Sequence, residues 1–293
     1  MLDGAMLVWF VLTILSVLFV VWDSLANGVT SWVQRAAWIL VTAYTGVVGL
    51  FFYLLTCRRP FPGGHDRYTA ATWKQAVNSE MHCLAGDATG IVLAAIIVSS
   101  LGLTNGWDAT IEYLAGFACG LFVFQALMMR GMYQGNYLLA VRKTFFAETV
   151  SMNLVMAGMI PTMVALAHHW PQSEDPTSAA FWFRMSLASL AGGFLAYPVN
   201  YWLVQRHLKH GCMTLPNADG PAPALGHRSA EASTVMAQSG EGHDTAAHHL
   251  MGHDDAMTMN ALPLSSAVAG VVLSFVVLLG ALMITNAFVP IRF

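Results

Sequence analysis

Long apolar stretches dominate this sequence and limit the folds that it can adopt. The hydrocarbon core of a bilayer is about 30 Å thick, and a helix crosses it with about 20 apolar residues. Lipid offers no partner for a free backbone amide, so such stretches cross as helices. They occur at approximately residues 4–23, 34–57, 79–103, 109–130, 145–168, 179–206 and 263–289. The sequence therefore predicts an all-α integral membrane helical bundle with about seven transmembrane helices.

The charge content agrees with this class. Charged residues make up 10% of the chain, with 13 Lys and Arg against 16 Asp and Glu, whereas a soluble domain carries roughly a quarter. This balance excludes a soluble globular enzyme and leaves no basic surface for nucleic acid. The chain also lacks the GxxxxGK[ST] loop of P-loop ATPases, the phosphorylated motif of P-type pumps, and the GxSxG and HExxH motifs of hydrolases.

Basic residues predict the orientation, because cytoplasmic loops carry an excess of Lys and Arg. Ten of the thirteen lie in three connections, as Arg58, Arg59, Arg67, Lys74, Arg130, Arg142, Lys143, Arg206, Lys209 and Arg228. With seven spans, this predicts an N-terminus inside and a C-terminus outside, in a bacterial inner (plasma) membrane. The expected divisions are a six-helix core at 1–206, a flexible cytoplasmic loop at 207–262 and a seventh helix at 263–293.

The 207–262 segment is the long polar region of the chain. Seven of the eleven histidines lie in it, at His207, His210, His227, His243, His248, His249 and His253. Pro, Gly, Ala and Ser fill much of the remainder, a composition that cannot build a packed core and predicts disorder.

The same segment mixes imidazoles with thioethers, most densely in HHLMGHDDAMTM at 248–259. Imidazole suits copper, nickel and zinc, and thioether selects Cu(I). One interpretation is a metal-collecting loop that uses His243, His248, His249, Met251 and His253. The alternative is a polar linker that is rich in histidine only by composition.

The span at 79–103 begins with four side chains that can bind metals. Glu80, Cys83 and Asp87 are spaced i, i+3 and i+7, which places them on one helix face, and His82 points away from that face. Glu80 and His82 have a simple alternative role as a helix end that contacts water. Asp87 lies about 10 Å deeper at 1.5 Å per residue, where an ionisable side chain indicates a functional site.

The span at 145–168 carries a stripe of methionines that starts at an acidic residue. Its members, on a face less than about 90° wide, are Glu148, Met152, Met156, Met159 and Met163. Methionine often fills irregular gaps in a core, so packing alone is one explanation. The other is a path for a soft cation, with Glu148 meeting the Glu80–Asp87 turns at a similar depth. The predicted metal ligands are Glu80, His82, Cys83, Asp87, Glu148, Met152 and Met156.

Three motifs carry a resemblance to a known family. They are HCLAGDATG at 82–90, FFAETVSMNLVMAGM at 145–159 and AYPVNYWL at 196–203. Over about residues 75–212 the chain resembles the bacterial membrane proteins catalogued as domain of unknown function 4396. Many members read HCGAGCxxGD at the first motif, so His82 and Cys83 match, while Asp87 replaces the second cysteine and Ile91 the acid. The resemblance implies a helical membrane core with an HC-containing site, and some relatives look linked to copper proteins.

These observations favour a transition-metal transporter or metal-handling protein, with copper as the favoured ion and nickel or zinc as alternatives. Two other functions stay open. One is an intramembrane metalloenzyme or redox protein, and the other is a structural or assembly subunit of a larger membrane copper enzyme. The expected partners are the lipid bilayer, the metal ion and another membrane or copper-handling protein, and not nucleic acid.

Overall fold

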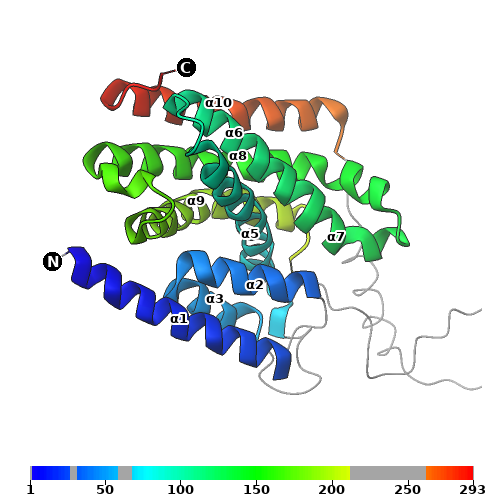
Figure 1. The fold of residues 1–293 in the computed structure, drawn as a ribbon. Coiled ribbons are helices and arrows are strands. Elements are labelled where there is room, and N and C mark those ends of the chain that lie inside the picture. Colours follow the sequence, from blue (N-terminus) through cyan, green and yellow to red (C-terminus); the bar gives the residue numbers. More distant parts are fainter. Residues whose placement is uncertain (1, 27–31, 59–67, 212–261, 293) are drawn as a thin grey trace, which may run out of the picture.

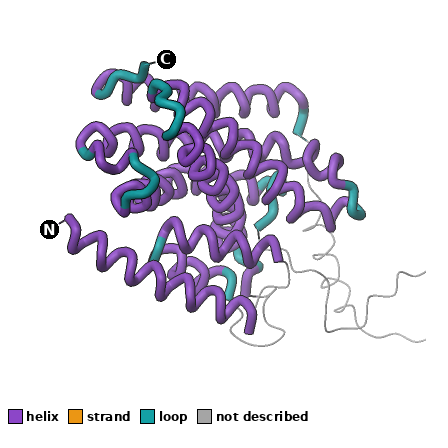
Figure 2. The backbone as a smooth tube through the Cα atoms, viewed as in Figure 1, coloured by secondary structure: helices purple, strands orange, loops and turns teal. Residues whose placement is uncertain are grey.

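The protein is described by a computed structural model over residues 2–26, 32–58, 68–211 and 262–292. This part of the chain is helical, with loops gathered at the two ends of the bundle (Figure 2). The elements are α1 (Leu2–Ala26), α2 (Trp32–Thr45), α3 (Val47–Thr56), α5 (Thr72–Val98), α6 (Asn105–Ala118), η1 (Cys119–Gln125), α7 (Ala126–Met129), η2 (Arg130–Tyr133), α8 (Tyr137–His169), η3 (Pro171–Glu174), α9 (Ala179–Gln205) and α10 (Leu264–Phe288).

Six of the described helical segments are long and apolar enough to cross a bilayer. They are Asp3–Ala26, Thr72–Val98, Asn105–Met129, Tyr137–His169, Ala179–Gln205 and Leu264–Phe288. Helices α1 and α10 expose most of their large apolar side chains, as helices in contact with lipid do. The protein is therefore an all-α integral membrane protein, and its helix count is close to the seven spans expected.

The difference lies in residues 34–57, which form two short helices instead of one span. Gly46 separates α2 from α3 with a positive φ of 61°, a conformation that glycine adopts without steric cost. The ring centroids of Trp38 and Tyr53 are 5.4 Å apart, and Gln34 Nε2 donates to Cys57 Sγ at 3.7 Å. Residues so far apart in sequence meet only if the chain reverses. The two helices therefore form a hairpin whose ends lie on the same side of the bundle.

This hairpin changes the expected placement of the chain ends. The six spans found among the described residues, an even number, bring the N- and C-terminal ends to one side of the bundle, where both lie in Figure 1. The expectation of an N-terminus inside and a C-terminus outside depended on a seventh span, and six spans do not give it. Arg35, next to Gln34, now joins the end of the bundle that holds Arg58 and the other basic connections. The Lys and Arg bias therefore predicts that both termini lie outside.

Helix α5 runs through the middle of the bundle and contacts α2, α3, α6, η1, α8 and α9 (Figure 1). Glycines allow its close approach to the neighbouring span. A Cβ built at Gly86 would lie 2.6 Å from Gly120 Cα, and one at Gly90 would lie 2.7 Å from Gly116 Cα. Small residues in this spacing are typical of helix pairs in membranes. The polar side chains in the middle turns of α5, from Asn78 to Asp87, are therefore buried against protein.

The topology can be tested with reporters fused to the two ends of the chain. We expect alkaline phosphatase, which is active outside the cytoplasm, to be active at both the N- and the C-terminus. Green fluorescent protein, which fluoresces inside, should be dark at both. Activity at one end and fluorescence at the other would contradict the hairpin.

Candidate functional site

The central helix α5 buries four ionisable or metal-binding side chains within two turns. Glu80, His82, Cys83 and Asp87 are exposed by 2% or less. Both ring nitrogens of His82 and both carboxylate oxygens of Asp87 are buried without a hydrogen-bond partner in the described chain. Buried polar groups are normally hydrogen-bonded. This turn of α5 therefore holds unused hydrogen-bonding and ligand-binding capacity.

Glu148 of α8 lies next to these side chains. The sequence placed it at a depth in the bundle similar to that of the Glu80–Asp87 turns. Cys83 Sγ donates to Glu148 Oε2 at 3.1 Å. Glu148 Oε1 and Asp87 Oδ1 both border the Cα of Gly120, so close that a Cβ at that position would collide with them. Glu148 Oε1 has no hydrogen-bond partner among the described residues. Two carboxyl groups from different helices thus converge on one small cradle.

The cradle lies where the span that begins with α6 changes from an α-helix to a π-helix. Gly120 belongs to η1, a π-helical segment at Cys119–Gln125. Such wide turns are rare and occur frequently at functional sites. Here the segment places a residue without a side chain against Asp87 and Glu148.

A lysine occupies the centre of the group. Lys209 Nζ donates to Cys83 Sγ at 2.7 Å and to Asn200 Oδ1 at 2.8 Å, and it lies 3.9 Å from Glu148 Oε2. Its side chain is fully buried. Burial alone lowers the pKa of the ammonium, but the nearby Cys83 and Glu148 outweigh that effect and raise the pKa above its ordinary value. Lys209 is therefore a buried partner of Cys83, Asn200 and Glu148 in the cluster.

A tight turn after α9 brings this lysine inward. His207 has a φ of 56°, and Leu208 N donates to Leu203 O at 2.9 Å. Leu208 is buried with Leu203 and Ala147. Leu208, Lys209 and Gly211 are thus buried against the helices, although they follow residue 207, where the expected loop begins. The apolar contacts of Leu208 and the ion pair of Lys209 explain the shift.

Asn200 connects the lysine to the remaining acid. Its Nδ2 donates to Glu80 Oε2 and, at 2.8 Å, to Ser151 Oγ, while its Oδ1 accepts from Lys209. The amide therefore bridges α5, α8 and the turn after α9. We call Glu80, Cys83, Asp87, Glu148, Asn200 and Lys209 the inner cluster.

The side chains of the inner cluster are not arranged as a metal site in this structure. Within the described ranges, no three His, Cys, Asp or Glu side chains are placed to hold an ion. The Lys209 ammonium lies against the Cys83 thiol and 3.9 Å from a Glu148 oxygen. Four carboxyl oxygens of Glu80, Asp87 and Glu148 are nevertheless buried without a hydrogen-bond partner among the described residues, so the cluster holds unused acceptor capacity.

The methionine stripe leads from the inner cluster toward the other end of the bundle. Met152, Met156 and Met159 are fully buried, and Met163 is 8% exposed. A Cβ at Gly116 would lie 2.9 Å from Met152 Cε, and one at Gly192 would lie 2.6 Å from Met159 Cγ. The methionines therefore pack between α6 and α9 along the whole length of this path.

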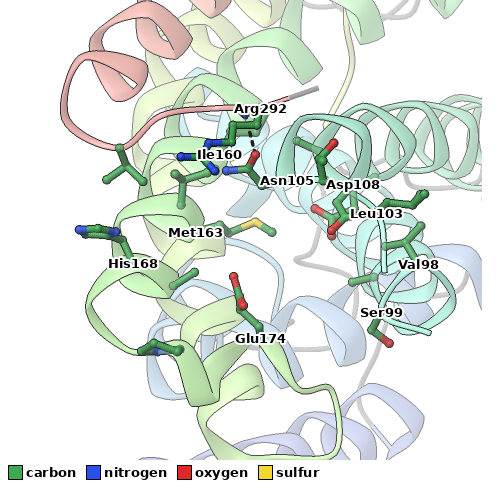
Figure 3. Close-up of a pocket in the computed structure, with 18 of the residues that line it drawn as sticks. Val98, Ser99, Leu103, Asn105, Asp108, Ile160, Met163, His168, Glu174 and Arg292 are labelled. Carbon is green, nitrogen blue, oxygen red and sulfur yellow. Dashed lines mark hydrogen bonds between the residues drawn. The ribbon is translucent and has the colours of Figure 1, made fainter. Parts of the chain in front are cut away.

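The stripe ends at a cavity of about 770 Å³. Met163 and His168 of α8 line it, together with charged side chains from the neighbouring segments. Figure 3 shows Met163 and Glu174 on one side of this outer pocket and Asp108 on the other. The outer pocket lies at the end of the bundle opposite the basic connections.

Four members of the inner cluster, Glu80, Cys83, Asp87 and Glu148, were among the residues that the sequence predicted, and Asn200 and Lys209 were not. A lysine just beyond a span resembles an ordinary membrane anchor, so Lys209 carried no signal. Lys209 lies nine residues after Asn200, beyond the end of α9. The two side chains meet only because the chain turns back there. The predicted metal-collecting residues His243, His248, His249, Met251 and His253 lie outside the described residues.

Loss of the buried ammonium should destabilise the protein strongly. Removing one partner of a buried pair typically costs roughly 3–5 kcal/mol, so Lys209→Met should lower the thermal unfolding temperature in detergent by many degrees. Adding Glu148→Gln should restore part of the loss. Lys143→Met, which removes an exposed lysine, is the control. Equal stability of Lys209→Met and the control would contradict the pairing.

Comparison with known proteins gives a match, and it covers the part of the chain that holds this site. Residues 72–209 match the family model described as Domain of unknown function (DUF4396). A search of curated proteins found no match, and a search of solved structures found none. The matched range begins with α5 and ends at Lys209, so it contains the entire inner cluster. The three motifs lie within the matched range, and the match confirms the resemblance that they carry.

Proposed function

We propose that the protein transports a transition metal ion across a bacterial inner membrane, with copper as the favoured cargo. The observation that supports this proposal is the inner cluster, in which three buried carboxyl groups, Glu80, Asp87 and Glu148, have oxygens without a hydrogen-bond partner among the described residues and a single ammonium, Lys209, lies close to Glu148. Unpaired buried charge is costly. A cation that enters the cluster would relieve this cost, so the cluster attracts cations.

The donor atoms favour a soft metal. Cys83 supplies a thiol, and Met152 of the adjacent stripe supplies a thioether close to Gly116. Thiolate and thioether ligands select Cu(I), whereas carboxylate alone suits Mg²⁺, Ca²⁺ or Mn²⁺. The carboxylates and the imidazole of His82 are ligands that also suit nickel and zinc. These two ions are the alternative cargoes.

Lys209 acts in this proposal as a tethered competitor of the metal. Its ammonium occupies the position between Cys83 and Glu148 that an incoming cation would take. Entry of the metal requires the lysine to leave, and departure of the metal lets it return. Such exchange suits a transporter, which must bind its ion and then release it.

The methionine stripe supplies the route. Met152, Met156, Met159 and Met163 extend from Glu148 to the outer pocket. Successive thioethers give a soft cation a series of weak ligands, and weak multiple sites favour passage over retention. The histidine- and methionine-rich residues 212–261 follow directly after the Lys209 turn. In this proposal they collect the ion or receive it from another copper-handling protein.

Metal content is the first test. Full-length protein and a variant lacking 213–259, both purified in detergent and loaded with Cu(I), should each retain about one copper ion that resists a weak chelator. Asp87→Asn combined with Glu148→Gln should lose this ion in the deletion background. Mass spectrometry of the metal provides the measurement.

Asp175→Asn serves as the matched control, because Asp175 is exposed and its carboxylate bonds only to Thr177 among the described residues. Loss of all copper with the 213–259 segment would contradict an intramembrane site.

The route is tested by removing thioethers without changing volume. Met156→Leu with Met159→Leu should reduce copper flux into liposomes several-fold, because leucine offers no ligand. Exchanges of similar volume usually cost less than about 1.5 kcal/mol, so the fold should persist. Met185→Leu, also buried but on α9, is the control. Equal flux in both variants would show that the stripe only packs the core.

A second candidate function is thiol redox chemistry. The 2.7 Å contact between Lys209 Nζ and Cys83 Sγ favours it, because an adjacent ammonium stabilises the reactive thiolate. Labelling with a small membrane-permeant alkylating reagent distinguishes the two functions. A redox thiol reacts rapidly without metal, whereas a transport ligand is protected when copper is bound.

A further inference from the structure

The outer pocket contains a second set of charged side chains that the metal proposal does not use. Three parts of the chain enclose this pocket. They are the connection between α5 and α6, the connection between α8 and α9, and residues 289–292. The chain end closes one side, since Arg292 N donates to Asn105 Oδ1 at 2.8 Å and Gly106 N to Arg292 O at 2.7 Å (Figure 3).

Two opposite charges are buried in this pocket without pairing with each other. Glu112 of α6 is 8% exposed and Arg184 of α9 is 7% exposed. No ion pair within 4 Å joins Glu112 to Arg184 among the described residues, and Arg184 Nε is buried without a hydrogen-bond partner there. Such groups are expensive when unsatisfied, and a direct ion pair would satisfy both. Both side chains line the cavity instead, with their charged atoms beyond ion-pair distance.

The residues next to Arg184 and Glu112 indicate which charged group each of them can bind. The Arg184 guanidinium lies 5.5 Å from the centre of the Phe181 ring, which holds its planar fork for a carboxylate. Asp108 lies four residues before Glu112, on the same face of α6, and also lines the pocket. One of its carboxylate oxygens is buried without a hydrogen-bond partner among the described residues. Asp108 and Glu112 therefore form an acidic side of the pocket, and Arg184 supplies a cation. Glu174 and Arg292 line the pocket as well.

An ion of a single sign satisfies only half of this arrangement. A cation at Glu112 leaves Arg184 unpaired, and an anion at Arg184 leaves Glu112 unpaired. A molecule with one ammonium and one carboxylate satisfies both. Apolar residues Val98, Ile160 and Val164 line the rest of the cavity, whose volume is in the range of small-molecule sites.

We propose that the outer pocket binds a small zwitterion with an apolar body, such as an aliphatic amino acid or dipeptide. Its carboxylate pairs with Arg184, and its ammonium lies between Glu112 and Asp108. This site is separate from the inner cluster and its test uses no metal, so either proposal can fail without the other.

The test measures binding to the full-length protein in nanodiscs of phosphatidylglycerol, which carry no zwitterionic lipid. Isothermal titration compares L-leucine and Leu-Leu with Leu-Leu-amide, which lacks the carboxylate, and N-acetyl-Leu-Leu, which lacks the ammonium. Loss of one charged contact is worth roughly tenfold or more in affinity. We expect leucine or Leu-Leu to bind and both blocked dipeptides to bind at least about tenfold more weakly.

Two variants assign the two charged contacts. Arg184→Gln should weaken the binding of leucine or Leu-Leu and leave the affinity for Leu-Leu-amide unchanged. Glu112→Gln should also weaken the binding of leucine or Leu-Leu, but leave the affinity for N-acetyl-Leu-Leu unchanged. Arg142→Gln, an exposed arginine at the opposite end, should change nothing. The ligand comparison uses unmodified protein, so it stands even if a variant fails to fold.

Three results would overturn the proposal. Equal binding of a free and a blocked dipeptide would show that one charge is sufficient. No binding of leucine or Leu-Leu would exclude this ligand class. Binding that disappears when phosphatidylethanolamine is mixed into the nanodiscs would identify the occupant as that lipid's zwitterionic headgroup.

Discussion

The burial of one lysine among three carboxyl groups determines much of the architecture. Lys209 reaches Cys83 on α5, Asn200 on α9 and the vicinity of Glu148 on α8. An isolated charge inside a membrane protein is costly, so these contacts tie the three helices and the final turn into one unit. The DUF4396 match covers this same unit and ends at the lysine. The first short hairpin and α10 pack around it as additional layers.

Close backbone approach makes this polar interior possible. Gly86 and Gly90 of α5 meet Gly120 and Gly116 of the next span, and the missing side chains leave room for Asp87 and Glu148. The π-helical turns at 119–125 aim Gly120 at the two carboxyl groups. An alanine at Gly120 would collide with both. Packing and chemistry are therefore coupled at one residue, since the interface that brings α5 and α6 together also forms the cradle.

The two ends of the bundle have different chemical character. The basic end carries the inner cluster and its lysine, and it leads into the histidine-rich part of the chain. The other end carries the outer pocket, with Glu112 and Arg184 held apart. Buried methionines connect the two. The proposed metal path and the proposed zwitterion site thus share a boundary at Met163 and use different charged groups.

The sequence by itself determined the class of this protein and much of its site. Apolar length predicted the spanning helices, helical spacing placed Glu80, Cys83 and Asp87 on one face, and depth brought Glu148 to them. Periodicity cannot show a reversal, so residues 34–57 resembled a span until Trp38 met Tyr53 across Gly46. Lys209 and Gly120 act through contacts with residues distant in sequence. Only the tertiary structure decided those contacts, because the low dielectric of the interior forces buried charges to find partners wherever the folded chain supplies them.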